Sequence, residues 1–216
     1  QPNECWQSDF THIRLSTGQD IEVIGWLDDH SRYLLHLSAH RRVTGKTVIN
    51  TFNTTCQTYG QPTSTLTDNG NVHTTRFAGY TGGKNGFEQL LAMQGITQKN
   101  GRPYKPTTQG KIERLWQTLK KWIAAHPADT IEELQQVLDQ FTTHYNTIRP
   151  HRSLGRKTPH LAYNLIPKAT PHPTGAPDIW RVRYDRLDPT GKMSLRAAGR
   201  MMHLGCGRKW AGNEVV

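Results

Sequence analysis

Three carboxylates stand where the surrounding sequence gives a charged side chain a chemical reason to be. Asp9 lies in the middle of a predicted strand, Trp-Gln-Ser-Asp-Phe-Thr, Asp68 directly follows another strand, and Glu113 lies early in a helix beside its apolar stripe. Taken singly, each has an ordinary explanation: an edge-strand residue, a turn former before Asn69-Gly70, and a surface glutamate. Because the three elements that carry them can meet at one place, the trio predicts a shared site.

A trio of carboxylates suits phosphodiester cleavage assisted by divalent cations. Cleavage needs an activated water or hydroxyl and a stabilised leaving oxygen, and two ions about 3.5–4 Å apart supply both. Hard oxygen ligands favour Mg²⁺ or Mn²⁺. We therefore predict two Mg²⁺ (or Mn²⁺) ions, with Asp9, Asp68 and Glu113 as both the metal-binding and the catalytic residues.

The polar turn at residues 28–31 offers rivals for the first carboxylate. Asp28 or Asp29 could take the place of Asp9. An aspartate before Ser31-Arg32 is explained by an Asx-turn, whereas an aspartate in the middle of a strand is not, so Asp9 is preferred.

Basic and amide side chains around Glu113 predict a DNA-binding surface. Gln117 and Lys120 follow it by four and seven residues and share its helix face, although Lys120 and Lys121 could also simply solvate the helix end and favour its dipole. The predicted DNA contacts are Asn69, Arg102, Lys105, Gln109, Lys111, Arg114, Gln117, Lys120, Arg149, His151, Arg152, Arg181 and Arg183.

The charge is uneven along the 216 residues, whose net charge is +10. Residues 1–146 hold 14 Lys and Arg against 13 Asp and Glu, whereas residues 147–216 hold 13 against 4. A basic tail beside a near-neutral region indicates a polyanionic partner, most simply double-stranded DNA. Three widely spaced cysteines argue against a structural zinc or a disulfide framework, and two of them, Cys5 and Cys56, are expected in the core.

The periodicity of the sequence predicts a mixed α/β order. Three strands, 5–15, 21–27 and 33–38, form an antiparallel meander, and a helix over 44–59 is capped by Thr44 and stopped by Gly60. A strand at 64–67, a Gly-rich loop at 80–88, a short helix at 87–93 and a strand at 96–99 follow. Two helices come next: one carries Glu113 and ends at Pro127, and the other opens with a Thr130–Glu133 capping box.

The last part of the chain is expected to form a separate module. Four prolines in residues 167–177 indicate a linker. Strands at 180–187, 192–196 and 200–204 predict a small basic all-β module. The predicted organisation is thus a core with closing helices at 1–166, the linker at 167–177 and the module at 178–216. The absence of an initiator Met and the strand beginning at residue 214 predict a fragment cut at both ends.

Six motifs in order closely resemble the DDE core of bacterial insertion-sequence transposases and retroviral integrases. They are WQSDFT, GWLDDHSRY, TLTDNG, YKPTTQGKIERLWQTLK, HYNTIRPHRSL and TPHLAY, and they span residues 6–163. The resemblance implies an RNase H-like core with a mixed five-stranded sheet and flanking helices. It also implies terminal cleavage and strand transfer within a protein multimer, a homodimer or larger, with Asp9, Asp68 and Glu113 as the triad and Lys120 as the family's basic residue after the glutamate.

Two departures accompany this resemblance. The gap between Asp68 and Glu113 is longer than in compact members, with Ala78–Glu88 as the apparent insertion, and the family's N-terminal DNA-reading helices are absent. The alternatives are a non-catalytic DNA-binding derivative and an RNase H-like nuclease without strand transfer. The sequence shows no long apolar run and no secretory signal, so we expect a cytoplasmic protein that acts at the nucleoid and not at a membrane.

Overall fold

The computed structural model describes residues 1–67, 85–100, 110–171, 185–197 and 200–215. The chain divides into two units, residues 1–176 and 177–216. No helix in these described ranges has the length and apolar character that a membrane span requires.

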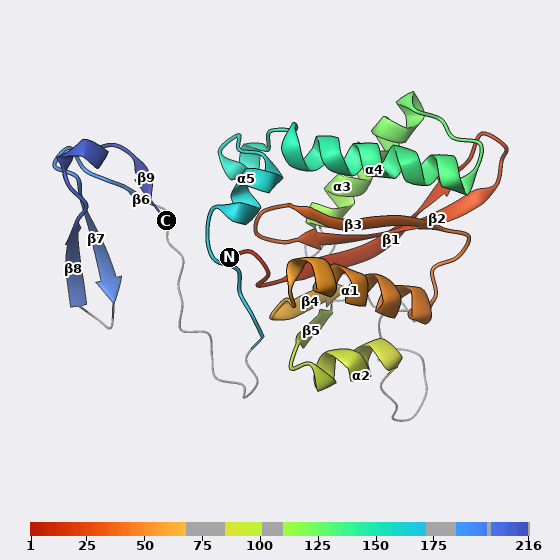
Figure 1. The fold of residues 1–216 in the computed structure, drawn as a ribbon, viewed down its shortest axis with the longest axis horizontal. Helices are drawn as coiled ribbons and strands as arrows, with labels where there is room; N and C mark the ends of the chain where they lie inside the picture. Colours follow the sequence, from red (N-terminus) through yellow and green to blue (C-terminus); the bar gives the residue numbers. More distant parts are fainter. Residues whose placement is uncertain (68–84, 101–109, 172–184, 198–199, 216) are drawn as a thin grey trace. The chain divides into compact units, whose positions relative to one another are not determined.

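The first unit is built on a five-stranded mixed sheet (Figure 1). Its strands are β1 Trp6–Arg14, β2 Asp20–Asp28, β3 Leu34–His40, β4 Ser64–Thr67 and β5 Thr97–Asn100, in the order β3-β2-β1-β4-β5. The first three strands form the predicted antiparallel meander, and β4 and β5 join it in parallel on the other side of β1. Because β1 is the central strand, both of its edges are paired, one with β2 and the other with β4.

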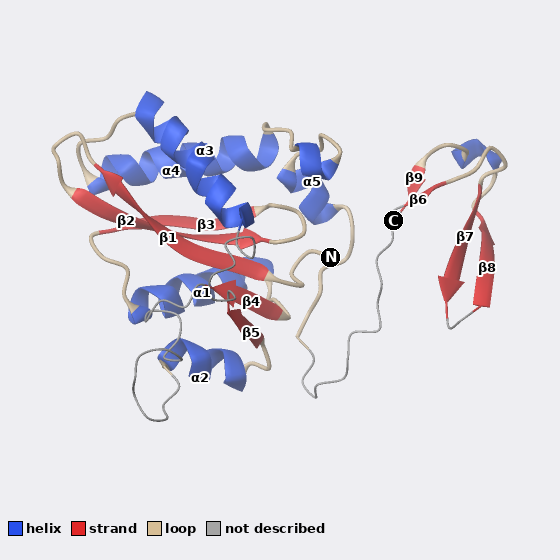
Figure 2. Ribbon diagram, turned by 180° about the vertical axis from the view of Figure 1, so that it is seen from behind, coloured by secondary structure: helices blue, strands red, loops and turns tan. Residues whose placement is uncertain are grey.

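Helices cover the two faces of the sheet (Figures 1 and 2). On one face lie α1 Gly45–Tyr59 and α2 Gly86–Met93, and on the other lie α3 Gly110–Ala125 and α4 Ile131–Thr147, with the short α5 Pro159–Asn164 after them. Each face has its own apolar core: Phe52 and Phe87 lie in the first, and Leu119 and Leu138 in the second. The predicted α/β core of sheet and flanking helices is confirmed.

The helix ends agree with the sequence except in two details. Thr44 caps α1 as expected, and Thr130 accepts a hydrogen bond from the Glu133 backbone N–H. The Glu133 carboxylate, however, accepts from the Asp129 N–H, so the predicted reciprocal capping box is wrong. Asn85 caps α2, which begins at Gly86, one residue before the helix expected over 87–93 and inside the stretch 80–88 expected as a Gly-rich loop.

The second unit contains four short strands in its described part. Asp185–Arg186 (β6) pairs with Glu214–Val215 (β9), and Lys192–Ala197 (β7) pairs with Arg200–Gly205 (β8). These strands fit the expected β-rich module. The expected strand at 180–187 is described only from Asp185, and the proposed linker lies partly outside the described residues.

Of the cysteines expected in the core, Cys56 packs partly buried against the first apolar core, and burial raises the pKa of its thiol to about 12. Cys5 is half-buried, and burial raises the pKa of its thiol as well.

Candidate active site

Asp9 lies half-buried on the central strand and contacts α3 directly. Its Oδ2 accepts a hydrogen bond of 3.0 Å from the indole Nε1 of Trp116. Trp116 follows Glu113 by three residues, which is about one helical turn. The Asp9 carboxylate therefore lies within one turn of the part of α3 that carries Glu113, whose own side chain is exposed.

Gly25 makes room for this contact. It is the cross-strand partner of Asp9 on β2, and a Cβ atom there would lie 2.8 Å from Cη2 of Trp116. Since real Cβ contacts are longer, any side chain at this position would push the indole away. The glycine thus lets Trp116 lie against the sheet beside Asp9.

Gln7 ties the first turn of α3 to the sheet. Its Oε1 accepts a 3.2 Å hydrogen bond from the Ile112 backbone N–H, and its Nε2 donates to Asp29 at 2.6 Å. A helix leaves its first backbone N–H groups without partners within the helix, and Gln7 satisfies one of them. Because Ile112 directly precedes Glu113, this bond fixes the backbone that carries the predicted ligand.

The third predicted carboxylate, Asp68, lies outside the described residues. The strand before it is well placed, because β4 ends at Thr67 and Thr67 pairs in parallel with Ser8, the residue before Asp9. The chain therefore leaves β4 beside Asp9. Within the described residues, no group of three or more His, Cys, Asp or Glu side chains is placed to bind a metal ion. Asp68 is not one of the described residues, so this search did not include it.

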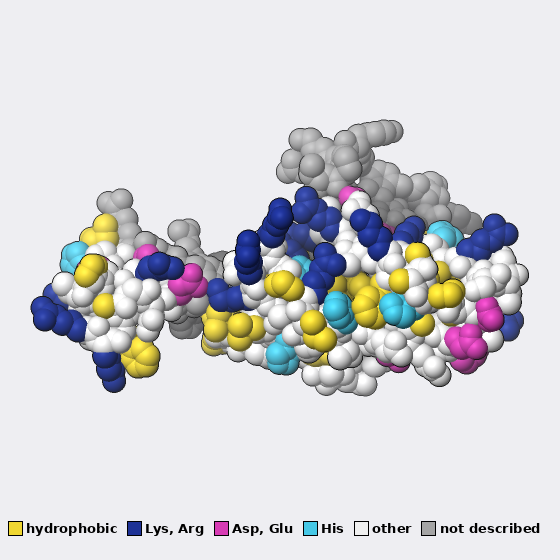
Figure 3. Space-filling model, turned by 90° about the horizontal axis from the view of Figure 1, so that it is seen from above, with side chains coloured by type: hydrophobic (Ala, Val, Ile, Leu, Met, Phe, Trp, Pro, Cys, Tyr) yellow, Lys and Arg dark blue, Asp and Glu magenta, His cyan; other side chains and the backbone are white. Residues whose placement is uncertain are grey.

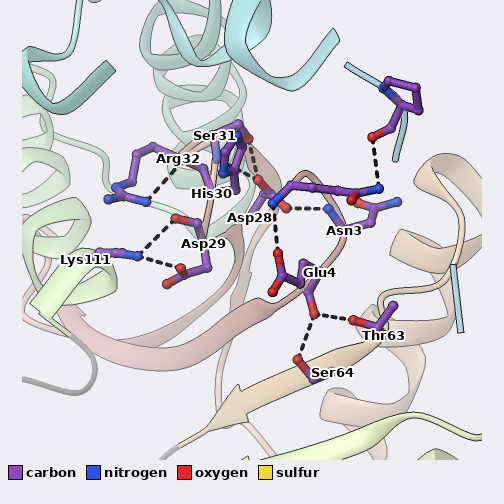
Figure 4. A network of polar contacts seen from close by, with 12 residues as sticks. Asn3, Glu4, Asp28, Asp29, His30, Ser31, Arg32, Thr63, Ser64 and Lys111 are labelled. Atoms are coloured by element: carbon purple, nitrogen blue, oxygen red, sulfur yellow. Dashed lines mark hydrogen bonds and ion pairs between the residues drawn. The ribbon is translucent and has the colours of Figure 1, made fainter. Parts of the chain in front are cut away.

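The two alternative carboxylates in the turn, Asp28 and Asp29, both accept hydrogen bonds from neighbouring residues (Figure 4). Asp28 is fully buried and accepts hydrogen bonds from the Asn3 backbone N–H and from both the N–H and the hydroxyl of Ser31. Burial raises the pKa of Asp28, while those hydrogen bonds oppose the shift. Asp29 forms an ion pair with Lys111 and accepts the bond from Gln7.

The predicted DNA contacts that the structure describes form two groups. Gln117 and Lys120 are exposed on α3. A second set lies around a hollow of about 750 Å³ beside the start of α3: Lys111, Arg114, Arg149, His151 and Arg152. Outside the described residues lie Asn69, Arg102, Lys105, Gln109, Arg181 and Arg183.

Comparison with known proteins identifies the fold and the family. Two family models, both described as integrase core domain, match residues 1–106 and 94–159. The chain belongs to the integrase core domain family. Together the two matches include Asp9, Asp68 and Glu113, so the sequence resemblance to transposases and integrases is confirmed.

Relatives of this integrase core come from bacterial insertion elements. It is 27% identical over 159 residues to an uncharacterized 39.2 kDa protein of insertion element IS476 from Xanthomonas euvesicatoria, covering 73% of this chain and 43% of that protein. It is also 27% identical over 161 residues to the transposase for insertion sequence element IS904 from Lactococcus lactis, covering 73% of this chain and 60% of that protein. The chain thus spans about half the length of these relatives.

A solved structure supports the same fold. The catalytic core domain of HTLV-2 integrase, determined in complex with magnesium, superposes with a TM-score of 0.58 at 19% identity and covers 75% of this chain and 97% of that domain. The RNase H-like core expected from the sequence is therefore present.

Within this integrase core, sequence reasoning missed the side chains that position the acids. The sequence placed Trp116 in the apolar stripe of its helix and Gly25 on one face of its strand, and it gave Gln7 no role. The one available signal was the glycine in the middle of β2, because glycine inside a strand often marks a close approach by another group.

Proposed function

We propose that this chain is the catalytic core of a DNA transposase that cleaves DNA at the ends of its element and transfers the strands into target DNA. The observation that carries the proposal is the hydrogen bond from Trp116 to Asp9, which brings β1 and the Glu113 turn of α3 together. The register of β4, which ends beside Ser8, supports Asp68 as the third member.

The donor chemistry of this trio fits a hard divalent cation. Asp9, Asp68 and Glu113 offer only carboxylate oxygens, the ligands that Mg²⁺ and Mn²⁺ prefer. We assign to them two such ions. When bound, the ions would lower the pKa of the attacking water or hydroxyl and stabilise the leaving oxygen.

The chain's own residues prepare this site for a phosphate. Trp116 orients the Asp9 carboxylate, and Gln7 holds the backbone next to Glu113. Gln117 and Lys120 follow Glu113 by one and two helical turns, so they lie on its face and would contact the DNA backbone near the reacting phosphate. Asn69, Arg102, Lys105, Gln109, Arg181 and Arg183 are proposed as further DNA contacts.

Strand transfer requires that element ends and target DNA be held together. We propose that two or more copies of the chain do so as a homodimer or larger multimer on double-stranded DNA, in the bacterial cytoplasm. The relationship to an insertion-sequence transposase supports this assignment.

A two-ended DNA assay tests the proposal. The full chain is incubated in Mg²⁺ with DNA that carries both ends of its own element, and nicks and joined products are measured separately for the wild type and Glu113→Gln. We expect both products from the wild type and neither from the variant, with DNA binding retained by both. Nicks without joining would indicate a nuclease, and binding with neither product would indicate a non-catalytic derivative.

A further inference from the structure

Asp29 joins three segments around the candidate active site. Its Oδ1 accepts a hydrogen bond from Gln7 Nε2 on β1, and its Oδ2 accepts one from Lys111 Nζ at the start of α3. The Lys111 ammonium also donates to the Asp29 carbonyl oxygen at 3.2 Å (Figure 4). The Asp29 backbone N–H donates to the Cys5 carbonyl at 2.9 Å, so the turn is held against the residue that precedes β1.

The partners of the Gln7 amide allow it only one orientation. Gln7 is 1% exposed, so both ends of its amide need partners within the protein. The Ile112 backbone N–H can only donate, and the Asp29 carboxylate can only accept. The amide therefore directs Oε1 to Ile112 and Nε2 to Asp29. Through this orientation, Asp29 determines that the acceptor end of Gln7 meets the residue before Glu113.

Lys111 provides a second connection between Asp29 and the first turn of α3. It precedes Glu113 by two residues, and its side chain is 36% exposed, against 30% for Asp29. A partly exposed ion pair adds little to the free energy of unfolding. The effect of this pair should therefore appear in the position of the first helical turn more than in the stability of the whole fold.

The same ion pair gives Lys111 a role other than the DNA contact predicted from the sequence. Its ammonium is bonded to both the carboxylate and the carbonyl oxygen of Asp29. Lys and Arg side chains gather along one face of the first unit (Figure 3), and Arg114 and Lys120 on α3 are exposed. The chain thus has other cations for phosphate groups, whereas the charge of Lys111 is offset by Asp29.

We propose that Asp29 is a positioning residue for Glu113. Its carboxylate orients Gln7 and holds Lys111, and these two contacts fix the residues before Glu113 relative to the strand that carries Asp9. Asp29 therefore acts through α3 and is not itself a metal ligand. This inference rests on the proposed function, in which Glu113 binds metal, although the contacts of Asp29 can be tested without it.

Amide hydrogen exchange tests the positioning without any measurement of activity. Asp29→Asn leaves one side-chain acceptor oxygen in place of two, and its NH₂ group faces whichever of Gln7 and Lys111 that oxygen does not meet. Exchange of the Ile112 N–H, followed by NMR in EDTA, should become about fivefold faster, since one hydrogen bond contributes about that factor. Unchanged exchange at Ile112 would overturn the proposal.

Two controls separate this local effect from a general loss of stability. Asp139→Asn is the matched variant, because Asp139 also accepts a hydrogen bond from a glutamine amide, that of Gln135, but on α4. It should leave the exchange of Ile112 unchanged. The amide of Ile24, which is buried on β2, reports on opening of the sheet. If Ile24 exchanges faster in Asp29→Asn by the same factor as Ile112, Asp29 only stabilises the fold and the proposal is wrong.

The Mg²⁺ requirement tests the consequence for Glu113. For Asp29→Asn, the Mg²⁺ concentrations for half-maximal nicking and for half-maximal thermal stabilisation should both rise about fivefold. The nicking rate at saturating Mg²⁺ should stay within about twofold of the wild type, because saturating ion offsets weaker positioning. A lower saturating rate with an unchanged Mg²⁺ requirement would contradict the proposal, and so would loss of every response to Mg²⁺.

Variants of Lys111 distinguish positioning from a phosphate contact. Lys111→Arg can keep the ion pair and should match the wild type, whereas Lys111→Met should raise the Mg²⁺ requirement. Lys111→Met should also leave the salt dependence of duplex binding unchanged, because a lost phosphate contact would lower the log–log slope by about 0.9. A lower slope with an unchanged Mg²⁺ requirement would overturn the proposal. If the wild type cuts no DNA, the proposed function fails, while exchange at Ile112 still reports on the positioning.

Discussion

Asp9 and Asp28 are aspartates on neighbouring strands of one sheet, yet their surroundings differ completely. Asp28 is fully buried, with hydrogen bonds from two backbone N–H groups and a serine hydroxyl. Asp9 is partly exposed and accepts a bond from an indole on the helix that carries Glu113. The hydrogen-bond donors around each carboxylate thus distinguish the two aspartates. Asp28 stabilises a turn, whereas Asp9 lies near the helix turn that carries Glu113.

The largest effect on stability should come from Asp28. Asp28→Ala leaves the Asn3 N–H and both Ser31 donors without partners in a buried place, and each such loss costs about 1–3 kcal/mol. We expect the free energy of unfolding to fall by about 3 kcal/mol or more in urea denaturation. Asp9→Asn keeps an oxygen for Trp116 and should change stability by less than about 1 kcal/mol. If Asp28→Ala and Asp9→Asn lower the free energy of unfolding equally, the two aspartates do not differ in their structural role.

Replacing Gly25 by alanine should lower the free energy of unfolding by less than Asp28→Ala does. Gly25→Ala places a Cβ against Trp116, and overpacking of this kind costs about 1–3 kcal/mol. The displaced indole should also release Asp9 and reduce nicking of DNA. Gly110→Ala is the matched control, because a Cβ there meets nothing within 4 Å. If Gly25→Ala unfolds and nicks DNA like the wild type, Trp116 does not position Asp9.

The smallest effect concerns Glu113 in chelator. Converging carboxylates repel one another without a cation, although exposure of Glu113 to solvent screens this repulsion. Glu113→Gln should therefore raise the melting temperature by a few degrees at most. Thermal unfolding in EDTA measures the shift, and a lower melting temperature would mean that Glu113 stabilises the fold as an ordinary surface residue.

Much of the fold could be predicted because it follows from local patterns. The stripe of α3 and the cap at Thr44 are properties of short segments, and the bounds of β4 were predicted correctly. The Asx-turn at Asp28 was expected, but its burial depends on Asn3, which lies 25 residues away. The contacts of Trp116 and Gln7 also join distant segments, and no periodicity reports them.

The most direct test of the account is the stabilisation that Mg²⁺ gives to the folded chain. A ligand that binds only the folded state at 100 times its Kd adds about 2.7 kcal/mol of stability. Thermal melts of the wild type, Asp9→Asn and Asp29→Asn are compared in EDTA and in millimolar Mg²⁺. We predict that the wild type and Asp29→Asn are stabilised by Mg²⁺ and that Asp9→Asn is not. Stabilisation of Asp9→Asn equal to that of the wild type, with loss of the effect in Asp29→Asn, would contradict the assignment of Asp9 to the metal site.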